Sequence, residues 1–148
     1  MLNEIYNRRI LELAASIPHL GRLADADASA TARSRLCGST VTVDLKVDGD
    51  VVSGFAHDVK ACALGQASSA IMGRHVIGST AEELRAVRAA ASRMLKENGE
   101  PPAGKWAELQ VLEPVRAFKA RHASILLTFD AVIDALDRIE ARRTWGGG

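Results

Sequence analysis

The sequence is poor in features that several common protein classes require. Its 148 residues include two cysteines, 4% aromatic residues and a formal net charge of +1. Two cysteines do not make a disulfide-rich secreted scaffold. With little net charge and few aromatic rings, the chain lacks both the electrostatic field and the stacking surface of a nucleic-acid-binding protein. We therefore expect no nucleic-acid partner.

Long hydrophobic runs are also lacking. No stretch reaches the length of a membrane span, and residues 2–9 contain no long apolar core of a signal peptide. We therefore expect no membrane association and a location in a reducing cytoplasm. The length and the apolar fraction of 47% suit a single domain over residues 1–148.

The most informative stretch lies between the two cysteines, Cys37 and Cys62. Its first half alternates apolar and polar residues, which is the period of a half-buried strand. The apolar face of that strand consists of Val41, Val43, Leu45 and Val47. Asp48-Gly49 then gives a strong two-residue turn signal, and a second β-rich run follows. We predict a β-hairpin over residues 40–60, which brings both cysteines to the same end of the ribbon.

The segments around the hairpin carry helical periods. Residues 2–17 predict an amphipathic N-terminal helix, and residues 63–142 predict a helical remainder. Residues 21–35 contain many turn formers with weak periodicity, and we predict a loop there. A strand alternation followed by several helical periods predicts an α+β fold, with a small antiparallel β-sheet and helices packed on one face.

Local signals mark the ends of helices in the remainder of the chain. Ser79 or Thr80 is expected to cap a helix that ends at residues 98–99. Pro114 is expected to break a short helical segment around Trp106. Ser124 is expected to be the N-cap of the last helix.

Cys62 directly precedes a run rich in small residues, residues 63–76, which predicts a helix. Its thiol would then lie at a helix N-terminus, where unpaired backbone N–H groups favour an anion. Two interpretations stay open: a metal-binding or reactive thiol, or the inert buried residue that a free cysteine more often is. His57, on the second strand, is expected to pack in the core or at an edge and to belong to no site.

The order of these features along the chain is distinctive. Cys-Gly is followed by an alternating strand, an Asp-Gly turn, a second strand, a cysteine, a small-residue helix, another helix, and an arginine-containing entry to a final helix. This order resembles the iron–sulfur cluster assembly scaffolds of the IscU, SufU and NifU N-terminal type. The likeness extends to about Ile139, and residues 98–112 and 118–121 are more similar to the SufU branch.

The resemblance implies ligand positions at Cys37 and Cys62, with two departures from the family pattern. The family has an aspartate two residues after its first cysteine, where this chain has Ser39. The family also has a third cysteine at the start of the last helix. One alignment register places Ser124 there and the other places Ala123, and we prefer the first because its match is longer.

The resemblance also implies what such a site would hold. A [2Fe–2S] cluster or a zinc ion takes four ligands, mostly thiolates. His122 is a suitable ligand type beside the third position, whereas a serine hydroxyl is a poor ligand at neutral pH. The candidate cluster-binding residues are Cys37, Cys62, Ser39 and Ser124, and the candidate metal ligands are Cys37, Cys62 and His122. A weakly held metal, a cluster shared with a partner or a second subunit, and no metal at all stay open.

The function that the resemblance implies is that of a scaffold or carrier, not a catalyst, which transiently holds iron, sulfur or a cluster. Its partners would be a cysteine desulfurase and the apo-proteins that accept clusters, and a homo-oligomer is compatible with this function. One alternative is a zinc-dependent sulfur acceptor for the desulfurase, as in the SufU branch. The other is a metal-free module that keeps the fold and docks partners.

Overall fold

The computed structural model describes the backbone of residues 7–35 and 38–146, and the side chains of these residues up to 143. The helices and strands are, in chain order, α2 (Arg8–Ala15), β1 (Ala28–Arg33), β2 (Thr40–Asp48), β3 (Val51–Lys60), α3 (Ala63–His75), α4 (Ala81–Lys96), the 3-10 helices η1 (Gly104–Ala117) and η2 (Lys119–Arg121), and α5 (His122–Gly146). No helix in this described part is long and apolar enough to cross a membrane.

The three strands form one antiparallel sheet in the order β1-β2-β3. Val41, Val43 and Leu45 of β2 are buried, which confirms the predicted apolar face for these three residues, whereas Val47 is half-buried after a register irregularity between Lys46 and Val47. The hairpin turn lies one residue later than predicted, because Asp48 pairs with Val51 and leaves Gly49 and Asp50 as the turn residues. Gly49 has a φ of 67°, a left-handed conformation that glycine adopts without strain.

The prediction of a loop over residues 21–35 is wrong for β1. This strand pairs with β2 from Ala28 opposite Leu45 to Arg33 opposite Thr40. Its apolar residues are alanines, whose small side chains and low strand propensity hide the alternation from a sequence pattern. Pairing with β2 and packing under α5 make this segment a strand, and Ala30 is buried beneath that helix.

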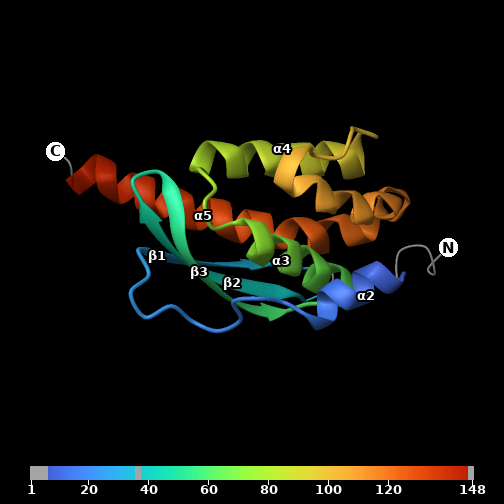
Figure 1. The fold of residues 1–148 in the computed structure, drawn as a ribbon, viewed down its shortest axis with the longest axis horizontal. Helices are drawn as coiled ribbons and strands as arrows, with labels where there is room; N and C mark the ends of the chain where they lie inside the picture. Colours follow the sequence, from blue (N-terminus) through green and yellow to red (C-terminus); the bar gives the residue numbers. More distant parts are fainter. Residues whose placement is uncertain (1–6, 36–37, 147–148) are drawn as a thin grey trace.

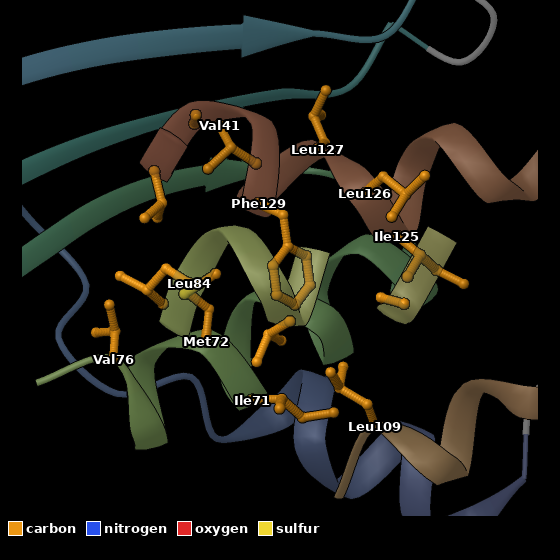
Figure 2. Close-up of a cluster of buried hydrophobic side chains, with 14 of the residues drawn as sticks. Val41, Ile71, Met72, Val76, Leu84, Leu109, Ile125, Leu126, Leu127 and Phe129 are labelled. Atoms are coloured by element: carbon orange, nitrogen blue, oxygen red, sulfur yellow. The ribbon is translucent and has the colours of Figure 1, made fainter. Parts of the chain in front are cut away.

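The helices lie on one face of the sheet, so the predicted α+β architecture is confirmed (Figure 1). The long helix α5 packs across β1 and β2, while α3 packs against both β3 and α5. Phe129 of α5 points into the middle of the core between these helices (Figure 2). The core side chains around it come from α3, α4, η1 and β2, and include Ile71, Met72, Leu84, Leu109 and Val41.

The chain between α2 and β1 covers the outer edge of β3 and the second face of the sheet. His57 donates its backbone N–H to the His19 carbonyl and accepts from the Gly21 N–H, at 3.1 and 2.8 Å. Its ring Nε2 lies 2.8 Å from the Pro18 carbonyl oxygen and donates to it, because a carbonyl only accepts. His57 is fully buried, which confirms the expected packed histidine, and burial lowers the pKa of its imidazole.

A buried carboxylate, Asp44, holds this covering segment to the second face of the sheet. Its oxygens accept from Arg22 Nε at 2.7 Å and Nη2 at 3.0 Å, from the Leu23 N–H at 2.8 Å and from Ser29 Oγ at 2.5 Å. Burial alone would raise the pKa of this carboxyl group. The hydrogen bonds from Arg22, Ser29 and the Leu23 amide, with the charge of Arg22, outweigh burial and hold the pKa at about 2.

The ends of α4 follow their sequence signals. Thr80 is the N-cap, and its Oγ1 accepts from the Glu83 N–H at 3.0 Å, which confirms one of the two predicted caps. The helix ends at Lys96. Asn98 then adopts a φ of 55°, and the Gly99 N–H donates back to the Arg93 carbonyl at 2.9 Å.

Two predictions about the C-terminal third are wrong. Pro114 does not break the short helix, because η1 runs through it to Ala117. Ser124 does not cap the last helix, because α5 already begins at His122, directly after η2. Two 3-10 helices, η1 and η2, therefore lead directly into α5.

A carboxylate in η1, Glu108, connects three elements on the helical side. It lies 3.0 Å from Arg74 Nε and 3.1 Å from His75 Nε2 of α3, and it pairs with Arg9 of α2. Burial raises the pKa of Glu108, but the His75 hydrogen bond and the arginine charges outweigh it and lower the pKa. This cluster fixes α2 and η1 against the C-terminal turn of α3.

Candidate functional site

The candidate site lies at the end of the sheet where β2 begins and β3 ends. Thr40, the first residue of β2, pairs with both Arg33 of β1 and Lys60 of β3. Ser34 and Ser39 close the β1–β2 turn, since the Ser34 N–H donates to the Ser39 carbonyl at 2.9 Å. Cys37 belongs to this turn by sequence but lies outside the described residues. The predicted approach of the two sulfur atoms therefore stays a prediction.

Cys62 lies at this same end, as the N-cap residue of α3. Its backbone is extended, with φ −68° and ψ 172°, and its carbonyl accepts the first helical hydrogen bond from the Gln66 N–H at 2.9 Å. The Cys62 thiol is free and half-buried. The Gln66 side chain reaches back to the Ala61 carbonyl at 2.8 Å, which fixes the chain just before the thiol. The expected position of this cysteine at a helix N-terminus is confirmed.

The start of α5 forms the wall beside Cys62. At Gly65, in the first turn of α3, an added Cβ atom would lie 2.8 Å from Ala61 Cβ and 3.3 Å from the Ser124 carbonyl oxygen. One turn further along α3, Ser68 Oγ donates to the Ile125 carbonyl at 2.7 Å. The two helices thus approach more closely than a larger side chain would allow. This close approach is the structural reason for the small residues that follow Cys62.

The two serines of the predicted ligand set are both buried. Ser39 is 4% exposed at the start of β2, and Ser124 is 2% exposed in the first turn of α5. Their backbones belong to the two segments that flank the N-terminus of α3. Ala123, the alternative to Ser124 in the other alignment register, is exposed and lines a cavity beside α4.

His122 is turned toward η1. The residue is 4% exposed, and its ring Nε2 lies 3.1 Å from the Val115 carbonyl oxygen and 3.2 Å from that of Arg116. Carbonyl oxygens only accept, so Nε2 carries the proton and Nδ1 is the nitrogen with a lone pair for a metal. Residues two positions apart on a helix point about 200° apart, so His122 and Ser124 lie on nearly opposite sides of α5.

Within residues 7–35 and 38–146, no group of three or more histidine, cysteine or acidic side chains is arranged to hold a metal ion. A metal or cluster at this end of the sheet therefore depends on Cys37, on groups beyond these residue types, or on ligands from another chain. Gly65 and Gln66 were not singled out by sequence reasoning, although each acts directly on the position of Cys62. Their signal lies in tertiary contacts and not in a local motif.

The structure is that of an α+β domain in which helices cover a small antiparallel sheet, with a free thiol at a helix N-terminus beside the sheet end. The family model described as the NifU-like N-terminal domain matches residues 5–124. The chain belongs to this family. The family resemblance predicted from the sequence is thereby confirmed.

Two curated relatives are named iron–sulfur cluster assembly scaffold protein IscU. The one from Thermotoga maritima is 28% identical over 136 residues, covering 91% of this chain and 94% of the relative. The one from Streptococcus pyogenes serotype M1 is 26% identical over 137 residues, covering 93% and 86%.

Solved structures share the fold over nearly the whole chain. A crystal structure of a nitrogen-fixing NifU-like protein (N-terminal) from Brucella abortus is 60% identical, with a TM-score of 0.93 and coverage of 95% of this chain and 98% of that one. A putative iron–sulfur cluster assembly scaffold protein for the SUF system from Fervidobacterium islandicum AW-1 is 23% identical, with a TM-score of 0.83 and coverage of 90% and 98%. At that identity the second structure shows the common fold alone.

Proposed function

We propose that this protein is a scaffold for iron–sulfur cluster assembly, which receives iron and sulfur, holds a transient cluster and passes it to apo-proteins. The observation that carries the proposal is the free, half-buried Cys62 thiol at the N-terminus of α3. Family membership and relatives named as scaffold proteins support it. Such a protein binds and transfers its cargo and is not itself an enzyme.

The cargo would be bound at the end of the sheet around Cys62. The helix N-terminus favours the negative charge of a thiolate, which is the form that binds iron. Cys37 would be the second thiolate ligand, and Ser39 and Ser124 lie in the flanking segments. With two thiolates from the chain, the remaining positions on a [2Fe–2S] cluster would be taken by weaker ligands, by a partner or by a second copy of the chain.

His122 belongs to the proposed ligand set through Nδ1 alone. Its Nε2 is bound to η1 carbonyl oxygens, which is the kind of outer contact that fixes the ring of a metal-ligating histidine. Ligation of a cargo at Cys62 by His122 would require the first turn of α5 to rotate. We therefore rank His122 after the two cysteines.

The partners that fit this function are a cysteine desulfurase as sulfur source and apo-proteins as cluster acceptors. Both exchanges would take place in a reducing cytoplasm, where thiols are kept free. Neither exchange involves a nucleic acid or a membrane. A homo-oligomer would supply further thiolates to one cluster, and its formation on loading can be measured directly by size-exclusion chromatography.

Anaerobic reconstitution with ferrous iron and sulfide tests the proposal. The wild type is expected to develop visible cluster absorption, with iron and sulfide in equal amounts per chain. Cys37→Ser and Cys62→Ser are each expected to lose it. Ala63→Ser is the matched control, because it adds the same hydroxyl one position further without removing a thiol. Equal, negligible loading of the wild type and both cysteine variants would contradict the proposal and favour a metal-free docking module.

A second candidate is a sulfur acceptor that takes the terminal sulfur of a desulfurase persulfide onto Cys62. The free thiol favours it. The Cys62 thiolate would bond to the outer persulfide sulfur, and the desulfurase cysteine would leave as a thiolate. Incubation with a desulfurase and free cysteine, followed by mass spectrometry, would show one added sulfur atom. A tightly bound zinc ion in the purified protein would favour the zinc-dependent form of this function.

A further inference from the structure

A basic cavity lies on the side of α5 away from Cys62. Its volume is about 580 Å³. The lining residues are Leu95, Lys96, Asn98, Arg116, Lys119, His122 and Ala123. They come from the C-terminal end of α4, from η1 and η2, and from the first turn of α5, which meet at one end of the molecule (Figure 1).

Three cations face this cavity from three separate elements. Lys96 comes from α4, Arg116 from η1 and Lys119 from η2, and no aspartate or glutamate is among the described lining residues. At its rim, Glu113 Oε2 lies 3.4 Å from Arg116 Nη2, so one carboxylate offsets part of this charge. The lining retains a net positive charge, which focuses the field of a concave surface on a bound anion.

Arg116 has a hydrogen-bond donor that the protein leaves unused. Its Nη2 donates to the Gly99 carbonyl at 3.2 Å, but its Nε is buried and has no partner. A buried N–H without an acceptor costs free energy. The Nε atom has almost no accessible surface, so a ligand oxygen reaches it only when the Arg116 side chain turns toward the cavity. The geometry of a guanidinium group suits an oxygen pair of a carboxylate or a phosphate.

The start of α5 forms one wall of the cavity through His122 and Ala123. Because η2 runs directly into α5, the His122 N–H donates to the Lys119 carbonyl and is not a donor for a ligand. The Asn98 side chain supplies an amide donor from a neighbouring direction.

We infer that this cavity binds a small polyanion that carries phosphate or several carboxylate groups. The volume lies within the range of small-molecule sites. Three converging cations match a di- or trianion, whereas the single carboxylate of a peptide side chain would leave most of that charge unbalanced. The cavity shares His122 with the proposed ligand set, but its test uses the metal-free chain and therefore does not depend on cluster binding.

Calorimetric and NMR titrations of the metal-free full chain with inorganic phosphate and with citrate test this inference. Saturable binding at low ionic strength is expected, with the largest shifts at the Arg116 Nε–H and the Ala123 amide. The double variant Lys96→Gln/Lys119→Gln is expected to weaken binding by about tenfold or more, since two of the three cations are removed. The matched control Arg8→Gln/Lys46→Gln makes the same change in net charge on other surfaces and is expected to bind like the wild type.

A second variant keeps every cation in place. Ala123→Asp puts a carboxylate at the cavity wall, and a helix N-terminus tolerates aspartate well. It is expected to abolish binding of both anions while the melting temperature is retained. No saturable binding by the wild type, or equal weakening by the control pair, would overturn the inference. Binding of a polyglutamate peptide without binding of phosphate or citrate would also overturn it, in favour of an acidic partner segment.

Discussion

Replacement of Asp44 by asparagine should destabilise the fold in a pH-dependent way. The pKa of this carboxyl group falls from an ordinary 3.8 to about 2 because four hydrogen bonds and the Arg22 charge stabilise its ionised form. Each pKa unit corresponds to about 1.4 kcal/mol, so ionised Asp44 contributes roughly 2 kcal/mol to the free energy of unfolding at pH 7. Asparagine keeps the shape and one acceptor oxygen but loses the charge.

The sign of the pH dependence follows from the direction of the shift. A lowered folded-state pKa means that the stabilisation is fully present above the unfolded pKa near 3.8 and is lost as the pH falls through about 2. The difference in unfolding free energy between wild type and Asp44→Asn should therefore be about 2 kcal/mol at pH 7 and should shrink between about pH 4 and pH 2.

Urea unfolding of both proteins at a series of pH values measures this difference. Asp58→Asn is the matched control, because Asp58 is an exposed residue of β3 on the same sheet. It should change the unfolding free energy by less than about 0.5 kcal/mol. A cost for Asp44→Asn that stays constant with pH would show that packing, and not the ionised carboxylate, is responsible. That result would refute the reasoning.

Three further predictions concern the site and the helical side. Ser124→Cys should raise the apparent affinity for zinc and for a reconstituted cluster, and the gain should grow as the pH rises toward the thiol pKa. Ala123→Cys should raise it much less, because position 123 points about 100° away from position 124 on the helix. The reverse ranking in zinc titrations would favour the alignment that places Ala123 at the third cysteine position. Gly65→Ala should lower the free energy of unfolding in urea by about 1–2 kcal/mol, because the clash of the new Cβ with Ala61 Cβ at 2.8 Å outweighs the gain in helix propensity. A variant more stable than the wild type would contradict this. Glu108→Gln should lower stability at pH 7 by more than at pH 4, because the lowered Glu108 pKa means that the stabilisation by the ionised carboxylate fades as the pH falls. A loss of melting temperature that does not change with pH would contradict this.

Much of the fold follows from local sequence signals. The β2–β3 hairpin, the cap of α4 at Thr80 and the helix after Cys62 were all predictable, because alternation, capping side chains and small-residue runs act over a few neighbouring residues. Strand β1 was not predictable in this way. Its alanines become strand-like only when β2 supplies hydrogen bonds and α5 supplies a cover.

The candidate site was predictable only in part. The position of Cys62 at a helix N-terminus follows from the residues after it. The direction of His122 does not, because the carbonyl oxygens that hold its ring belong to η1, a 3-10 helix that continues through Pro114 against its sequence signal. The basic cavity had no sequence signal at all, since its three cations lie on separate elements and meet only through the tertiary fold.

The place of α5 at the end of the chain sets the order in which the site can be completed during synthesis. This helix, His122–Gly146, covers β1 and β2 and supplies the wall beside Cys62. Until it has left the ribosome, the nascent chain already contains both cysteines, while the face of β1 and β2 that α5 covers is still exposed. The thiols are therefore made long before the surroundings that would hold a cargo. A nascent chain should gain the ability to retain iron and sulfide only when its last helix can fold back.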